Sequence, residues 1–300
     1  MKHRPAFDQL EQLCQKPDHR HVGNWMARHV SRPVALRITW LVAPWGISAN
    51  MATVAAWTLG VAGAGALAWG TLGGWILGAA LLQVWYLLDH VDGQLARLRG
   101  TASLDGTQLD YLMHHTINLL VPLGIGVGLA TESIEPLWAM AGLAWGVSLL
   151  LITLQHDARY KAFNKRLKRV RGQLVVKGGG GGRPIAQPPV PHHPLRLAAW
   201  LARKGCEPHV VTNVLAAVAI VQLLCADESL RTAKICVVVF APIAMAVTAW
   251  TILRSLKDNA AEQEFSAWYR PLPGHDLTFE NGWWVVENRR RPATSTREQE

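Results

Sequence analysis

The sequence predicts an all-α integral membrane protein with six transmembrane helices and an N-terminal amphipathic helix in the membrane interface. Two observations predict this class. Half of the 300 residues are hydrophobic and only 17% are charged, and several long stretches carry no charged side chain at all. A membrane-spanning helix needs about 20 apolar residues. A soluble enzyme, a secreted disulfide scaffold and a disordered chain are excluded, because none of them holds so many full-length apolar helices.

The N-terminal segment, residues 1–46, is expected to be cytoplasmic and to carry the interfacial helix. Residues 18–43 mix arginines with tryptophans and aliphatic residues, which is typical of a helix lying in the headgroup region. Gly46 interrupts this pattern, and Ser48 is a candidate N-cap for the first span. The polar, basic composition of the first 37 residues indicates that the first span is not a cleaved signal peptide.

Residues 47–254 are expected to form one membrane domain with six spans. No charged residue lies between Arg37 and Asp89, and a glycine-rich turn at 70–74 divides this stretch into two helices. Four more uncharged stretches follow, at 111–131, 136–156, 208–226 and 235–253. Each of these stretches is long enough for one transmembrane helix.

Two segments outside the spans have distinct compositions. Residues 158–206 form a basic, Gly- and Pro-rich cytoplasmic loop, in which Lys161 to Arg171 are expected to extend the fourth span as a helix. Residues 178–194 of this loop are expected to be a flexible linker. The cytoplasmic tail, residues 255–300, contains Asn281-Gly282 between apolar residues, which predicts a small hairpin, and it ends in polar sequence expected to be disordered.

The distribution of lysine and arginine predicts the orientation. These residues are concentrated in the N-terminal segment, the large loop and the tail, whereas the opposite loops carry almost none. By the positive-inside rule, both termini and the turn between spans two and three face the cytoplasm, which places the protein in the cytoplasmic cell membrane. Topology and attraction to anionic membrane lipids explain the net charge of +9. We expect no nucleic-acid partner, because no basic stripe is interleaved with aromatic residues.

Ionisable residues gather at the predicted cytoplasmic ends of spans two and three. Asp89 and Asp92 lie three residues apart on one helix, and Asp110 and His114 lie four apart on the next. Each pair therefore shares a helix face. Ionisable groups are costly beside apolar helices and indicate a functional site. Two antiparallel helices joined by a short turn can bring three carboxylates and an imidazole together around one or two divalent cations.

Small residues and an arginine accompany this ionisable set. Gly93 and Ala96 follow Asp92 on the first helix, and Gly106 stands on the second. They leave room for close helix approach or for a ligand packed against bare backbone. Arg97 is always charged and can bind a phosphate through two hydrogen bonds. The set indicates a site for an anion bridged by metals.

This segment resembles the signature of the CDP-alcohol phosphotransferase family, D-x2-D-G-x2-A-R-x8-G-x3-D-x3-D. Seven of its eight fixed positions are met, by Asp89, Asp92, Gly93, Ala96, Arg97, Gly106 and Asp110. Six spans and Asn50-x-x-Thr53 at the head of the first span also resemble the family. The motif stands in the helical, cytoplasmic context that its mechanism needs, which makes the resemblance specific.

The resemblance implies transfer of a substituted phosphate from a CDP-linked donor, commonly CDP-diacylglycerol, to an alcohol or alcohol-phosphate acceptor, with release of CMP in phospholipid biosynthesis. It implies that Asp89, Asp92 and Asp110 hold divalent metals, Mg²⁺ or Mn²⁺, that polarise the pyrophosphate. It further implies a CDP site and a homodimer, since the family often forms homodimers. The residues implied for the CDP site are Asp89, Gly93, Ala96, Arg97 and Gly106.

The eighth position departs from the family pattern, because His114 replaces the aspartate that serves the family as general base and ligand of the second metal. Asp110 and His114 are therefore the candidate catalytic residues. An imidazole is a stronger base than a carboxylate, a poorer ligand for Mg²⁺ and a better one for Mn²⁺ or Zn²⁺. Three interpretations stay open: an active enzyme in which His114 is the base, an active enzyme with altered metal use, and a relative that has lost the transfer reaction.

Two other classes of function compete with a transferase. A non-catalytic relative that binds CDP-lipid is supported by His114 alone. A membrane transporter also uses carboxylates and histidines within helices, but transporter sites lie near the bilayer midplane, whereas these residues lie at one end of their spans. Arg159 and Lys165 lie on the cytoplasmic side of span four and are further candidates for binding an acceptor phosphate. The alternative is that they only set the orientation of the span, as basic residues on its cytoplasmic side.

Overall fold

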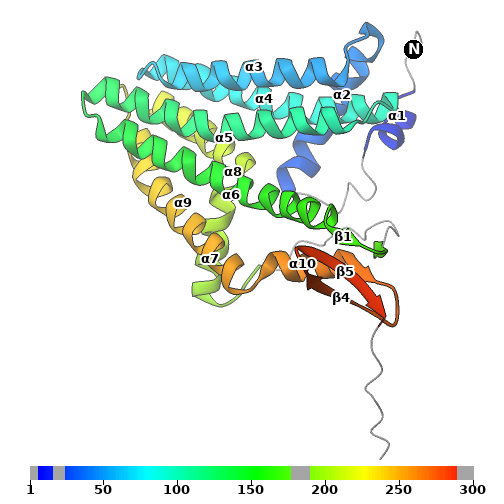
Figure 1. Cartoon of the computed structure of the whole chain (residues 1–300). Coiled ribbons are helices and arrows are strands. Elements are labelled where there is room, and N and C mark those ends of the chain that lie inside the picture. Colours follow the sequence, from blue (N-terminus) through cyan, green and yellow to red (C-terminus); the bar gives the residue numbers. More distant parts are fainter. Residues whose placement is uncertain (1–5, 16–23, 177–189, 289–300) are drawn as a thin grey trace, which may run out of the picture. The chain divides into compact units, whose positions relative to one another are not determined.

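The computed structural model describes residues 6–15, 24–176 and 190–288 (Figure 1). Part of the predicted linker, part of the predicted interfacial helix and the polar end of the tail therefore lie outside the described residues. The chain divides into two compact units. The first comprises residues 1–153 and 184–250, and the second comprises residues 154–183 and 251–300.

Short helices precede the first span. They are α1 (Phe7–Cys14), the π-helix η1 (Ala27–Ser31), α2 (Arg32–Val42) and the 3₁₀-helix η2 (Ala43–Trp45). Leu10, Cys14 and Leu36 are buried together with Leu98, so α1 and α2 pack on the helix that carries Leu98. The predicted segment 18–43 is thus helical from residue 25 onward, and its place at a membrane interface stays a prediction.

The chain is a multi-pass membrane protein. Within the described ranges, five helices are long and apolar enough to cross a membrane. These are α3 (Ala49–Leu67), α4 (Leu72–Arg99), α5 (Leu104–Ser133), α6 (Leu137–Leu167) and α9 (Arg231–Lys257). A sixth span arises if α7 (Pro194–Gly205) and α8 (Pro208–Leu224), which meet at an angle of 81°, count as one. The uncharged stretch between Arg37 and Asp89 contains α3 and most of α4, and each of the four later stretches corresponds to one of these helices.

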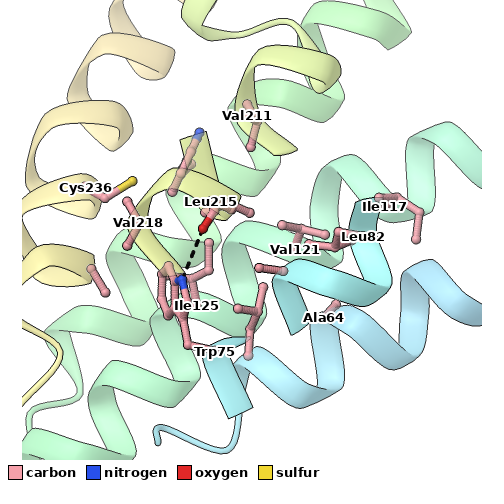
Figure 2. Close-up of a cluster of buried hydrophobic side chains, with 14 of the residues drawn as sticks. Ala64, Trp75, Leu82, Ile117, Val121, Ile125, Val211, Leu215, Val218 and Cys236 are labelled. Carbon is pink, nitrogen blue, oxygen red and sulfur yellow. Dashed lines mark hydrogen bonds between the residues drawn. The ribbon is translucent and has the colours of Figure 1, made fainter. Parts of the chain in front are cut away.

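The core of the first unit lies where α3, α4, α5, α6, α8 and α9 meet, and Figure 2 shows part of it. Trp75 is buried there, and its indole N–H donates to the carbonyl oxygen of Leu215 at 3.4 Å. Glycines let the helices approach closely: a Cβ at Gly124 would lie 2.3 Å from the carbonyl oxygen of Ala64. Helices α3, α4 and α5 consequently run side by side (Figure 1).

The second unit contains the ends of α6 and α9, helix α10 (Ala260–Trp268) and two small sheets. One sheet has the order β1 (Val170–Arg171), β5 (Trp283–Asn288), β4 (His275–Glu280). The other pairs β2 (Leu174–Val176) with β3 (Tyr269–Pro271).

The predicted hairpin of the tail is confirmed. Strands β4 and β5 pair antiparallel, with Glu280 opposite Trp283. Asn281 and Gly282 between them have φ values of 49° and 83°. Positive φ at both central residues is the geometry that makes Asn-Gly favourable in a two-residue hairpin loop.

Candidate active site

The motif residues lie where α4 ends and α5 begins. Helix α4 ends at Arg99, and Gly100 adopts the left-handed conformation, with φ of 63°, that terminates many helices. Ser103 caps α5, because its hydroxyl accepts a hydrogen bond from the backbone N–H of Gly106 at 3.0 Å. This tight connection places the last turns of α4 beside the first turns of α5.

A cavity of about 500 Å³ opens between these turns. All eight motif positions line it: Asp89, Asp92, Gly93, Ala96, Arg97, Gly106, Asp110 and His114. Asn50 and Thr53 of α3, which the sequence also associates with the family, complete one wall. Gln15 and Arg32 contribute from the N-terminal helices. Sequence reasoning did not place these last two residues at the site.

Asp89, Asp110 and His114 form a compact cluster in this cavity. Nε2 of His114 lies 3.4 Å from Oδ1 of Asp89, and Nδ1 of His114 lies 3.3 Å from Oδ1 of Asp110. One potential ligand atom from each residue lies within 4.8 Å of those of the other two. Two carboxylates and an imidazole are a donor set that fits a divalent cation.

The backbone determines which nitrogen of His114 offers a lone pair. Nδ1 lies 3.0 Å from the carbonyl oxygen of Asp110. That oxygen can only accept, so we assign the proton of the neutral imidazole to Nδ1, which donates to it. The Nε2 lone pair then faces Asp89. A single lone pair can take up a metal or a proton, but not both at once.

Asp92 lines the same cavity but stands apart from the three-residue cluster. Its side chain is buried, and the hydroxyl of Thr53 donates to its Oδ2 at 2.7 Å. A hydroxyl from α3 therefore fixes the orientation of a carboxylate on α4. The three predicted carboxylates share one cavity, and two of them form the compact group with His114.

Two glycines and Arg97 shape the cavity wall. A Cβ at Gly93 would lie 3.3 Å from Nη1 of Arg97, and a Cβ at Gly106 would lie 3.3 Å from Oδ1 of Asn50. Nε of Arg97 donates to the carbonyl oxygen of Cys14. Burial raises the pKa of the Cys14 thiol to about 11, so this thiol stays neutral and supplies no negative charge to Arg97.

The helix η1–α2 is joined to α4 at the rim of the cavity. The hydroxyl of Thr39 donates to Oε1 of Gln94 at 2.8 Å, and Nε2 of Gln94 donates to the carbonyl oxygen of Arg32 at 3.3 Å. Gln94 is an unspecified position of the motif, and its side chain is almost completely buried. These bonds explain why Arg32 reaches the site although no motif includes it.

His90, His115 and Arg159 lie outside the three-residue cluster. His90 lines the cavity, and its Nδ1 lies 2.9 Å from the carbonyl oxygen of Tyr86. Nδ1 of His115 lies 3.1 Å from the hydroxyl of Thr153 on α6, so His115 faces a neighbouring helix. Arg159 belongs to the second unit, where it pairs with Glu264 at 3.1 Å.

Comparison with known proteins agrees with the motif. Residues 46–175, which extend from just before α3 into β2, match the family model described as CDP-alcohol phosphatidyltransferase. Among solved structures, the chain is similar to the crystal structure of Mycobacterium tuberculosis phosphatidylinositol phosphate synthase (PgsA1) with CDP-DAG bound. The identity is 20%, the match covers 68% of this chain and 90% of that chain, and the TM-score is 0.39. No curated protein matches this chain.

Proposed function

For a chain whose residues 46–175 match the family model of CDP-alcohol phosphatidyltransferases, we propose transfer of a phosphatidyl group from a CDP-linked lipid such as CDP-diacylglycerol to the hydroxyl of an alcohol. CMP is the second product, and the reaction belongs to phospholipid biosynthesis. One observation carries this proposal: all eight motif positions line one cavity, in which Asp89, Asp110 and His114 cluster.

The donor's nucleotide fits the wall made by small residues. Gly93, Ala96 and Gly106 expose backbone to the cavity, which lets a flat base or a sugar approach closely. Arg97 stands on the same wall, and its guanidinium can hold a phosphate oxygen through two hydrogen bonds. Because α4 and α5 are apolar beyond the site, a lipid donor can enter sideways from the bilayer.

The carboxylates of the site suit a divalent metal, on which the family generally depends. We propose that Asp89 and Asp110 hold this metal and that Asp92, oriented by Thr53, supplies a further oxygen. A bound cation would neutralise charge on the pyrophosphate as the transfer proceeds. Mg²⁺ and Mn²⁺ both accept this oxygen set, which leaves the Nε2 lone pair of His114 free of the metal.

His114 is proposed as the base. The alcohol oxygen forms a bond to the phosphatidyl phosphorus, and the bond from that phosphorus to the bridging oxygen of CDP breaks, so CMP leaves. The hydroxyl proton moves to Nε2 of His114. Asp110 positions the ring through its carbonyl oxygen, and its carboxylate, 3.3 Å from Nδ1, stabilises the imidazolium that forms.

The test is CMP release from CDP-diacylglycerol by the purified full chain. Glycerol phosphate, inositol phosphate, serine and simple alcohols are compared as acceptors, each with Mg²⁺ and with Mn²⁺. Release that depends on one acceptor establishes the transferase and identifies the acceptor. If CDP-diacylglycerol binds but no acceptor releases CMP, the chain is a non-catalytic lipid-binding relative and the proposal fails.

We also propose that both termini and the site face the cytoplasm and that the protein forms a homodimer. The bias of lysine and arginine toward the N-terminal segment, the large loop and the tail supports this orientation. Labelling of single cysteines introduced at 71 and 281 in intact cells tests it, because the first should react with an impermeant reagent and the second should not. Cross-linking in membranes tests the homodimer.

A further inference from the structure

A second cavity, of about 370 Å³, lies on the N-terminal helices. Three arginines, Arg28, Arg32 and Arg37, line it together with His29. Glu11 is the single acidic residue of its lining. The cavity therefore carries an excess of positive charge, which suits an anionic ligand with several acceptor oxygens.

One arginine of this cavity has an unsatisfied donor. Nε of Arg28 is buried and has no hydrogen-bond partner within the part of the chain that the structure describes. Buried donors are rarely left unpaired in native proteins, and each such group calls for an explanation. Among the described residues, the acceptor for this donor is therefore missing beside the basic cavity.

The backbone at the cavity is unusual. Arg28 and His29 lie in η1, a π-helix, and the backbone N–H of Arg32 bonds back to the carbonyl oxygen of Ala27 across this turn. Single π-turns are rare and occur frequently at functional sites, because the extra residue changes where the neighbouring side chains point. The π-turn is an observation independent of the charge of the cavity.

An apolar groove adjoins the basic cavity. It has a volume of about 480 Å³ and is lined by Phe7, Arg37, Trp40 and Leu41. Phe7 and Arg37 line both spaces, so the two are neighbours. Phe7 is 42% exposed and Leu41 is 47% exposed. A basic cavity beside an apolar groove, in a membrane protein, matches the charged headgroup and the acyl chain of a phospholipid.

We propose that these adjoining spaces bind an anionic phospholipid distinct from the CDP-linked donor. Its phosphate contacts Arg28, Arg32 and Arg37, and an acyl chain lies over Phe7 and Leu41. Arg32 and Gln15 also line the active-site cavity, so a lipid bound here contacts residues of the catalytic wall. Asp89, Asp110 and His114 take no part in this lipid site. The inference therefore holds whether or not the chain catalyses transfer.

The experiment is native mass spectrometry of the full chain in detergent, titrated with phosphatidylglycerol and with phosphatidylcholine. The unmodified protein is expected to bind phosphatidylglycerol about tenfold more tightly than phosphatidylcholine. The double variant Arg28→Gln/Arg37→Gln is expected to lose this preference. The matched control, Arg196→Gln/Arg203→Gln, removes the same charge from two exposed arginines of α7 and is expected to keep it.

Three results would overturn the proposal. The first is equal phosphatidylglycerol binding by the two double variants, which means that net charge and not this cavity attracts the lipid. The second is complete displacement of the lipid by millimolar inorganic phosphate, which identifies a site for a soluble anion. The third is complete displacement by CDP-diacylglycerol, which makes the cavity a part of the donor site.

A further variant keeps the test decisive if the double variant does not fold. Arg28→Lys preserves the charge and removes the Nε–H and the planar fork. A several-fold loss of phosphatidylglycerol affinity is expected in this variant, with an unchanged melting temperature. Unchanged affinity would show that the unpaired Nε of Arg28 is not what binds the phosphate.

Discussion

Nε2 of His114 lies 3.4 Å from Oδ1 of Asp89, although the two residues belong to different helices. The contact exists because Gly100 ends α4 and Ser103 begins α5 within one short turn. The carbonyl oxygen of Asp110 fixes the proton of the ring on Nδ1. The lone pair that faces Asp89 is therefore the group through which His114 acts, as a base or as a metal ligand.

Replacing His114 by glutamine substitutes an amide, which takes up no proton near neutral pH, for the basic ring nitrogen and keeps a polar side chain. We expect kcat to fall about 10²-fold or more, which is the range for loss of a positioned base. The matched control is His115→Gln, because His115 is adjacent in sequence and contacts Thr153 on α6. Acceptor-dependent CMP release measures both variants. Equal losses in the two would contradict the role of His114 as the base.

His114→Asp restores the carboxylate of the family signature and tests the choice of metal. An all-oxygen cluster binds Mg²⁺ better and Mn²⁺ less well than one containing imidazole. Because the account makes His114 the base and the carboxylates the metal ligands, we expect the ratio of Mn²⁺- to Mg²⁺-supported activity and the Mn²⁺ affinity, measured by electron paramagnetic resonance, to change less than about twofold. A several-fold loss of Mn²⁺ affinity would show that the imidazole is itself a metal ligand. A variant that gains transfer activity from an inactive parent would instead show that the natural chain has lost the reaction.

The hydroxyl of Thr53 holds the buried carboxylate of Asp92. Thr53→Val leaves that carboxylate without its donor, which we expect to lower stability by about 1–3 kcal/mol and to weaken metal binding several-fold. Thr58→Val is the matched control on the same helix, since the Thr58 hydroxyl is exposed and bonds only to its own helix at Val54. Thermal melting with and without Mn²⁺ measures both effects. Identical metal-induced shifts in the two variants would refute the positioning role.

Gly93 keeps the cavity wall free beside Arg97. In Gly93→Ala the new Cβ meets the guanidinium at 3.3 Å, so we expect about tenfold weaker competition by free CDP, with the fold retained. Gly73→Ala on the same helix is the control, because a Cβ there has nothing within 4 Å. Inhibition constants for CDP measure the effect. Equal constants in both variants would place the nucleotide elsewhere.

Local patterns of the sequence predict most of this fold. Each uncharged stretch became a helix, and Asn281-Gly282 became the turn of a hairpin. Helix α4 continues past its apolar part to Arg99, because the charged motif residues remain helical and face a cavity. Strands β1 and β2 have only two and three residues, which is too short for an alternating pattern to be visible.

The active site, too, is only partly predictable from the sequence. The spacing of Asp89, Asp110 and His114 predicts their shared helix faces, and the structure brings them together. Gln15 and Arg32 reach the cavity through packing of α1 and α2 on α4, around Leu36 and Leu98. Such contacts join distant parts of the chain and leave no periodic signal in the sequence.

The central claim is tested most directly by comparing Asp110→Asn with Asp105→Asn in CMP release from CDP-diacylglycerol. Both changes remove one carboxylate from the start of α5, but Asp105 is exposed and lies outside the Asp89–Asp110–His114 cluster. The account predicts that acceptor-dependent CMP release disappears in Asp110→Asn and persists in Asp105→Asn. Release that persists in Asp110→Asn would contradict the assignment of this cluster as the catalytic centre.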